Sequence, residues 1–183
     1  MAVESVLVRP ARPGDAAALN RMVARCSPRT RYERFHGVVE VIPPEYLRRC
    51  LYGDEQEAVV AETVTGELVG LASTGPLPGE PDGCELGVLV EDSWQRKKIG
   101  RLLTSELLDR AHARGLSFVR LELCRLQPGL LDYVVTHLPV VARQDAGCDV
   151  TVDVSPVLPR PAPVTARPRR SSGAPRRGAP ART

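Results

Sequence analysis

The chain has 183 residues, of which 43% are hydrophobic and 4% aromatic, and its formal charge is +3. This size suits one domain with a single sizeable core, and no apolar run is long enough to span a bilayer. No charged and then apolar leader opens the sequence, so we expect a soluble, cytoplasmic protein without a membrane partner. The five cysteines form no CxxC pair and show no metal-like spacing with histidine, which predicts reduced thiols and no metal.

The first part of the chain alternates between strand-like and helical segments. Apolar residues recur at helical spacing after Asp15, which we expect to cap a helix that ends near Cys26. Thr65-Gly66 separates two β-rich runs and predicts a hairpin turn. The predicted elements are a strand over residues 6–10, helices over 15–26, 29–35 (closed by Gly37) and 44–51, and strands over 57–63 and 67–77.

The second part begins with a loop over residues 76–83 that is rich in proline and glycine. A strand follows from Glu85 to Val90, and apolar residues at helical spacing from Ile99 predict a helix that ends at Gly115. The remaining predicted elements are a strand over 117–123, a weaker helix over 126–138 interrupted at Pro128 and Gly129, and closing strands over 140–143 and 149–154.

Residues 156–183 have a different composition, with seven prolines, seven arginines and no acidic or aromatic residue. This predicts a disordered tail after a domain over residues 1–155, whose formal charge is then −4. Such a tail could bind nucleic acid, an acidic protein surface or the domain itself. Because it has no aromatic side chain to stack on bases, nucleic acid is an unlikely partner and a solubilising extension is the simpler interpretation.

The segment between the strand that ends at Val90 and the helix that begins at Ile99 is the most informative part of the chain. The first turn of a helix presents unpartnered N–H groups at the positive end of the helix dipole, and Gly100 lets a ligand approach this backbone closely. Four basic side chains add positive charge there: Arg96, Lys97, Lys98 and Arg101. The pattern predicts a phosphate-binding turn, with an ordinary solvated basic turn as the alternative.

Gln95-Arg-Lys-Lys98-Ile-Gly100 resembles the Gln/Arg-x-x-Gly-x-Gly/Ala coenzyme A loop of the GNAT superfamily of N-acetyltransferases. Trp94 and the preceding Val-Leu-Val strand also fit, whereas Lys98 stands where the family usually has glycine. The resemblance implies a GNAT fold of the α/β (α+β) class, with a central mixed, mostly antiparallel sheet flanked by helices. It also implies acetyl-CoA as cosubstrate, bound by Val88, Leu89, Val90, Gln95, Arg96, Lys97, Lys98, Ile99, Gly100 and Arg101.

Glu85 lies ten residues before Gln95, at the start of the strand that leads into the loop. Acetyl transfer needs a group that takes a proton from the attacking amine. A glutamate at this spacing is similar to the catalytic base of bacterial Pat-type protein-lysine acetyltransferases. The segment Ser27-Pro-Arg-Thr-Arg-Tyr32-Glu-Arg-Phe35-His-Gly37 also resembles their Ser-Pro-x-Ser-x-Tyr-x-Arg-Phe-Phe segment. The resemblance thus implies Glu85 as the base, and a solvent-facing strand residue is the alternative.

Two further groups complete the expected chemistry. A backbone N–H of Val88 or Leu89 would stabilise the negative charge that develops on the thioester oxygen. Many GNAT enzymes protonate the departing thiolate with a tyrosine, and Tyr133 is the phenol in the matching region of this chain. The sequence that follows it departs from the family pattern, so packing is the first role expected for Tyr133 and general acid the second.

Residues 29–52 are expected to shape the acceptor site. Glu33, Glu40 and Glu45 favour a cationic amine, whereas the arginines at 29, 31, 34, 48 and 49 equally favour an acidic acceptor or the adenosine 3′-phosphate. The predicted function is an acetyl-CoA-dependent N-acetyltransferase, with a protein lysine as the first acceptor and a small-molecule amine as the second. The alternative is a GNAT-like regulatory domain that binds acyl-CoA with weak or no catalysis. We expect a monomer or a homodimer.

Overall fold

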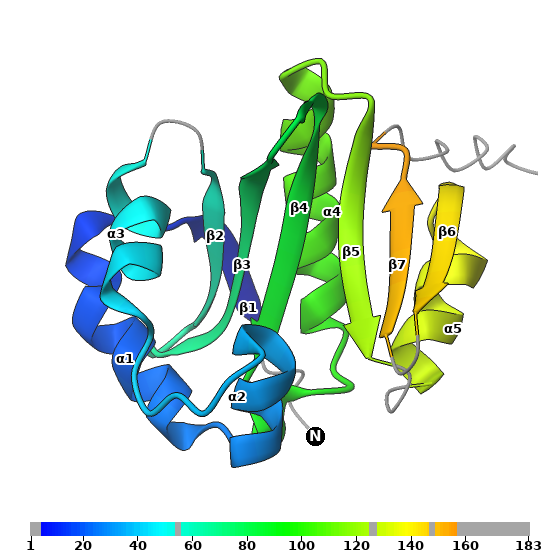
Figure 1. Ribbon diagram of the computed structural model, residues 1–183. Helices are drawn as coiled ribbons and strands as arrows, with labels where there is room; N and C mark the ends of the chain where they lie inside the picture. Colours follow the sequence, from blue (N-terminus) through cyan, green and yellow to red (C-terminus); the bar gives the residue numbers. More distant parts are fainter. Residues whose placement is uncertain (1–4, 54–55, 125–127, 147–148, 157–183) are drawn as a thin grey trace, which may run out of the picture.

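The computed structural model describes residues 5–53, 56–124, 128–146 and 149–156 (Figure 1). They form one seven-stranded sheet in the order β1-β2-β3-β4-β5-β7-β6, in which every neighbouring pair is antiparallel except β4 and β5. The elements are β1 (Val6–Pro10), α1 (Ala16–Arg25), α2 (Pro28–Phe35), α3 (Pro44–Tyr52), β2 (Ala58–Thr63), β3 (Leu68–Leu77), β4 (Glu80–Val90), α4 (Ile99–Ala113), β5 (Phe118–Cys124), α5 (Pro128–His137), β6 (Val140–Ala146) and β7 (Asp149–Val154). The mixed, mostly antiparallel sheet flanked by helices confirms the predicted fold class.

Helices cover both faces of the sheet (Figure 1). On one face, α1, α2 and α3 pack through a core that includes Leu19, Met22, Leu51 and Leu89. On the other face, α4 and α5 pack through a second core that includes Leu103, Leu107, Val119, Val134 and Val152. Successive residues of β4 point to opposite faces, so Leu86 and Val88 face α4, while Leu89 faces α1 to α3.

The two parallel strands at the centre of the sheet separate along their length. β4 has 11 residues and β5 has seven, yet the two strands pair only where Gly83–Glu85 meets Phe118–Arg120. A Cβ atom at Gly83 would lie 2.6 Å from Cε2 of Phe118, so glycine allows the close approach at this end. Beyond Glu85 the strands diverge towards the end of the sheet near α2 (Figure 1). This divergence opens the sheet between β4 and β5.

Two predicted helix ends are wrong in detail. Asp15 does not cap α1 with its side chain; its carboxylate accepts a hydrogen bond from the Arg12 N–H at 2.8 Å and pairs with Arg9 at 2.7 Å. These contacts hold a 3₁₀ turn over Pro13–Asp15 ahead of the helix. α2 ends at Phe35 as expected, but the residue that closes it is His36, which adopts a left-handed conformation with φ of 49°, rather than Gly37. Helix ends depend on such local alternatives, which periodicity does not resolve.

Two segments that the sequence predicts to be irregular belong to regular secondary structure. The loop expected over residues 76–83 is a tight turn at Pro78-Gly79, in which Gly79 has φ of 79° and the flanking strands run to Leu77 and from Glu80. Pro128 does not interrupt a helix but begins α5, because a proline at the first helical position has no N–H that the helix needs. Gly115 follows α4 with φ of 77°, as its position predicts.

Part of the expected organisation lies outside the described residues. The predicted tail beyond Pro156 and Cys148 belong to this part, so the boundary between domain and tail stays a prediction. Among the helices that the structure does describe, none is both long enough and apolar enough to cross a membrane.

Candidate active site

One cleft occupies the opening between β4 and β5 and has a volume of about 1030 Å³. α2, α5 and the N-terminal turn of α4 complete its walls. Nine of the ten predicted coenzyme-binding residues line it, as do Glu85 and Tyr133. The exception is Lys97, whose ammonium lies 4.4 Å from the centroid of the Trp94 ring. The fold thus brings the predicted loop and the two predicted catalytic side chains to one cavity.

The N-terminus of α4 supplies backbone donors to this cleft. Leu102 N–H donates to Lys98 O at 3.1 Å, which is the first hydrogen bond of the helix. The N–H groups of residues 99–101 therefore have no carbonyl partner within the helix. A Cβ atom at Gly100 would meet Val90 and Val88 side chains at ordinary contact distances of 3.8 and 3.9 Å. Gly100 lines the cleft, so a larger side chain there would enter the space beside these donors.

The turn before α4 contains two non-glycine residues in the left-handed region, Arg96 with φ of 60° and Lys98 with φ of 68°. A side chain with a Cβ adopts this conformation at a cost of about 1 kcal/mol. A glycine at position 98 would adopt it without that cost. Lys98 thus keeps the backbone path of the turn under local strain, and its exposed side chain lines the cleft.

Hydrogen bonding of β4 identifies which of its N–H groups face the opening. Glu91 N–H donates to Val69 O on β3 at 3.0 Å. Because backbone groups of successive strand residues point to alternate sides, Leu89 also faces β3, whereas Val88 faces the gap towards β5. The Val90 carbonyl agrees with this alternation, since it accepts a hydrogen bond from Gln95 Nε2 at 3.0 Å instead of from β3. Of the two predicted oxyanion donors, the geometry favours Val88.

A hydrogen-bond network joins the coenzyme loop to α2. Asp92 accepts from the Ser27 N–H at 2.8 Å, from Ser27 Oγ at 2.8 Å and from Thr30 Oγ1 at 2.9 Å. Gln95 Nε2 also donates to Thr30 Oγ1, at 3.2 Å. Burial raises the pKa of the Asp92 carboxyl, but the hydrogen bonds from Ser27 and Thr30 outweigh it, so the pKa lies below its ordinary value. No local sequence pattern identifies Asp92, because its partners lie more than sixty residues away in the chain.

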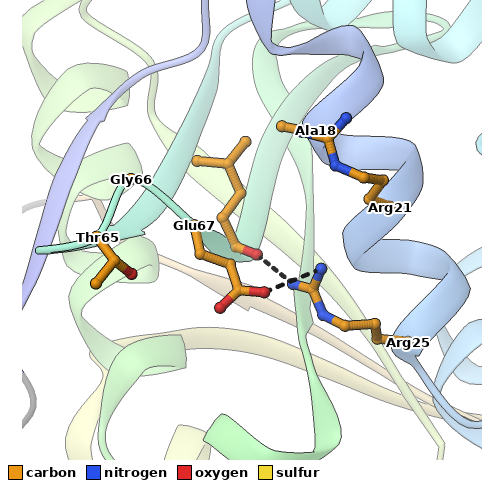
Figure 2. Close-up of a pocket in the computed structure, with 7 residues that line it drawn as sticks. Ala18, Arg21, Arg25, Thr65, Gly66 and Glu67 are labelled. Atoms are coloured by element: carbon orange, nitrogen blue, oxygen red, sulfur yellow. Dashed lines mark hydrogen bonds and ion pairs between the residues drawn. The ribbon is translucent and has the colours of Figure 1, made fainter.

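A second anchor holds the end of β4 against α1. Figure 2 shows Arg25 of α1 reaching the β2–β3 hairpin, where it donates to Leu68 O at 2.8 Å and pairs with Glu67 at 3.2 Å. The same guanidinium pairs with buried Glu91 at 2.7 Å, and Ser93 Oγ donates to the other Glu91 oxygen at 2.8 Å. Since Glu91 directly follows β4, these contacts hold the start of the connection that leads to the predicted coenzyme loop.

The two predicted catalytic side chains come from different elements. Glu85 is exposed at the last position where β4 pairs with β5, and its carboxylate has no hydrogen-bond partner among the described residues. It is therefore open to a ligand in the cleft. Tyr133 of α5 is half-buried, and its ring stacks on that of His137 with centroids 4.8 Å apart. This stacking agrees with a packing role for Tyr133, and the residue also lines the cleft.

Cysteine and metal chemistry find little support in the described part of the chain. Cys26, Cys50 and Cys84 are free and buried, and burial raises the pKa of Cys26 and of Cys84 to about 11. These groups stay protonated at neutral pH and are poor nucleophiles. Among the residues that the structure describes, no group of three or more histidine, cysteine, aspartate and glutamate side chains is placed to hold a metal ion.

Comparison with known proteins identifies the fold and the family. The sequence profile of the Acetyltransferase (GNAT) family matches residues 24–127, and an acetyltransferase of Pseudomonas aeruginosa is 30% identical over 115 residues, which are 60% of this chain and 61% of that protein. The GNAT domain of PAT from S. lividans superposes with a TM-score of 0.71 at 18% identity, covering 84% of this chain and 97% of that domain. PaiA N-acetyltransferase from Thermoplasma acidophilum, solved in complex with coenzyme A, superposes with a TM-score of 0.58 at 18% identity, covering 82% and 99%.

The family match and the cleft agree on the same segment. The matched range includes β4, the loop after it and α4, which together form one side of the cleft. It also covers more than half of the chain. The chain therefore belongs to the GNAT family of acetyltransferases.

Proposed function

We propose that the protein is a cytoplasmic, acetyl-CoA-dependent N-acetyltransferase, with the lysine side chain of a protein as its first acceptor. The observation that carries this proposal is the single cleft that combines the N-terminus of α4, the Val88 N–H and the Glu85 carboxylate. Family membership supports the use of acetyl-CoA. Residues 1–155 would form the catalytic domain, and residues 156–183 a separate basic tail.

The proposed binding mode assigns the N-terminus of α4 and the free edge of β4 to different parts of acetyl-CoA. Its pyrophosphate lies at the N–H groups of residues 99–101, where the helix dipole and the charges of Arg96, Lys98 and Arg101 favour an anion. The pantetheine arm then follows the edge of β4 between residues 88 and 90. Gln95 keeps this edge in place through its hydrogen bond to the Val90 carbonyl.

The proposed reaction uses one side-chain base and one backbone donor. Glu85 takes the proton from the acceptor amine, whose nitrogen then attacks the thioester carbon. The Val88 N–H stabilises the negative charge that develops on the carbonyl oxygen. As the C–S bond breaks, the acetyl group stays on nitrogen and the sulfur leaves as a thiolate, to which Tyr133 can give a proton. The thiolate is a good leaving group, so Tyr133 is the least essential member of the set.

A small-molecule amine is the second candidate acceptor, and a regulatory acyl-CoA-binding domain is the competing function. Lys98 is the observation that favours the regulatory alternative, because its left-handed backbone strains the turn that the family usually builds with glycine. The Pat-type character inferred from the Ser27–Phe35 segment and Glu85 favours catalysis on a protein lysine.

Turnover decides between these functions. The full chain is incubated with acetyl-CoA and with lysine peptides or small primary amines, coenzyme A release is followed by a thiol reagent, and products are weighed by mass spectrometry. The proposal predicts thiol release that depends on a primary amine, with a mass gain of one acetyl group on the peptide lysine. Tight acetyl-CoA binding without amine-dependent release would instead establish the regulatory alternative.

A further inference from the structure

The acceptor side of the cleft contains a guanidinium for which the proposed chemistry has no use. Arg34 projects from α2 into the cleft wall and lies over Gly87 of β4. A Cβ atom at Gly87 would come within 2.8 Å of Arg34 Nε, so only glycine leaves room for the guanidinium at this position. The side chain is therefore part of the active-site wall and not a mobile surface arginine.

Neighbouring groups hold Arg34 in one orientation. Its Nη2 donates to the Tyr46 hydroxyl, which in turn lies 2.6 Å from Ser73 Oγ, and Ser73 is the cross-strand partner of Gly87. The guanidinium carbon also lies 5.0 Å from the Tyr46 ring centroid and 5.3 Å from that of Phe35. These contacts use one nitrogen and the faces of two rings. They position the charge without neutralising it.

The charge of Arg34 has no counter-ion in the described part of the chain. No carboxylate there forms an ion pair with it, although Glu33 on the same helix pairs with Arg29 at 2.7 Å and Asp92 is held by Ser27 and Thr30. Arg34 Nε is buried without a hydrogen-bond partner, and Nη1 donates no hydrogen bond to any of the described residues. Because partly buried charges are normally paired, a free N–H in a ligand cleft indicates that the ligand brings the anion.

We propose that Arg34 binds a carboxylate of the acceptor and thereby selects amines that carry an acidic group at a fixed distance. This inference rests on the proposed function. Glu85 and Gly87 are alternate residues on the same face of β4, about 7 Å apart along the strand. An amine at Glu85 and a carboxylate at Arg34 are separated by a similar distance. The α-amine of a free amino acid is too close to its own carboxyl group to bridge that span, whereas a lysine side chain can.

Two sources of carboxylate fit this distance. One is the side chain of an acidic residue next to the acceptor lysine in a peptide, and the other is the α-carboxylate of the acceptor lysine itself. Matched pairs distinguish them: an acetylated, amidated peptide with Lys-Asp is compared with Lys-Asn, and Nα-acetyl-lysine is compared with its amide. Each pair differs in charge but hardly in size.

The test measures kcat/KM for each acceptor with the full-length wild type and with Arg34→Gln. We expect at least one pair to show a preference of about tenfold or more for the carboxylate. Arg34→Gln should reduce that preference to within about twofold while sparing the neutral acceptor. Arg48→Gln is the matched control, because this α3 arginine pairs with Glu45 on the surface and does not line the cleft. It should keep the preference.

The outcomes distinguish failure of the role proposed for Arg34 from failure of the proposed function. Equal rates for both members of both pairs in the wild type would overturn the inference and leave the proposed function intact. An equal loss on charged and neutral acceptors in Arg34→Gln would also overturn it, because that result indicates a purely structural contact between α2 and β4. Arg34→Lys, which keeps the charge, should retain part of the preference and serves if the glutamine variant does not fold. No turnover with any amine would overturn the proposed function, and this inference with it.

Discussion

The proposed coenzyme side of the cleft, formed by β4, the loop after it and the start of α4, and the proposed acceptor side at α2 present different kinds of group. The proposed coenzyme side offers backbone N–H groups from β4 and from the first turn of α4, and the basic side chains at 96, 98 and 101, in and just before this turn, are exposed. The acceptor side uses side chains that are fixed by other side chains, as in the contact of Arg34 with Tyr46. A site made of backbone groups depends on the path of the chain and tolerates many side-chain substitutions. A site made of side chains depends on each residue that positions them.

Asp92 and Gln95 join the two sides, because both contact Thr30 of α2. The loop that is expected to bind pyrophosphate is thus attached to the helix that carries Arg34. Changes on each side and at this junction should affect different measurements, and this separation can be tested.

The largest expected effect is that of Glu85→Gln. Loss of the base should lower kcat by about 10²- to 10⁴-fold, while acetyl-CoA affinity changes little, because the side chain acts on the acceptor amine. Steady-state kinetics and calorimetry separate the two quantities. Glu122→Gln, at another exposed glutamate of the same cleft, is the control and should change kcat by less than about threefold. Similar losses in both variants would remove the special role of Glu85.

Asp92→Ala tests the junction between the two sides. The variant loses the hydrogen bonds from Ser27 and Thr30 at the start of α2, and we expect a fall of about 2 kcal/mol in the free energy of unfolding. Urea titration measures this, with Asp109→Ala on the exposed face of α4 as the control. An unchanged unfolding midpoint would show that the network contributes nothing to stability.

The stability that the Asp92 carboxylate contributes is also expected to depend on pH. Folding lowers the pKa of Asp92, so its stabilising effect is present above the ordinary aspartate value of about 3.9 and is lost as the pH falls through the folded-state value. The difference in stability between the wild type and Asp92→Asn should therefore shrink below about pH 4. A difference that stays constant down to pH 2.5 would contradict the assignment.

Tyr133→Phe distinguishes packing from proton donation. If Tyr133 donates a proton to the departing thiolate, kcat should fall by about tenfold with little change in stability, since the ring and its stacking on His137 remain. Kinetics and thermal unfolding are measured on the same preparation. An unchanged kcat would assign Tyr133 to packing alone.

Lys98→Gly should have the smallest effect of these variants, and it should raise the free energy of unfolding, whereas Asp92→Ala lowers it. Removing the side chain relieves the left-handed strain and should stabilise the protein by about 1 kcal/mol, although a positive charge is lost. Lys97→Gly is the control, because it removes the same charge at a residue whose φ is not in the left-handed region. Equal destabilisation by both changes would show that strain at Lys98 is not relieved by glycine.

The sequence predicted the structure of β4 and α4 far better than the contacts that α2 makes with them. Glycine at 100 and the apolar spacing after Ile99 are local signals, so the loop, α4 and the position of Glu85 on β4 followed from them. The contacts of Asp92 with Ser27 and of Arg34 with Gly87 join segments more than fifty residues apart, and no local pattern encodes them. The tight turn at Pro78-Gly79 was missed because proline and glycine suit both a long loop and a hairpin.

We propose above all that this cleft binds acetyl-CoA at the start of α4. Calorimetric titration of the full chain with acetyl-CoA tests this binding most directly. The wild type and Gly14→Leu, at a glycine with open space around it, should bind acetyl-CoA at one site and bind ATP far more weakly. Gly100→Leu should fold normally and lose about thirtyfold in affinity, or about 2 kcal/mol, because its side chain enters the phosphate site. No acetyl-CoA binding by the wild type, or equal binding by Gly100→Leu, would contradict this claim.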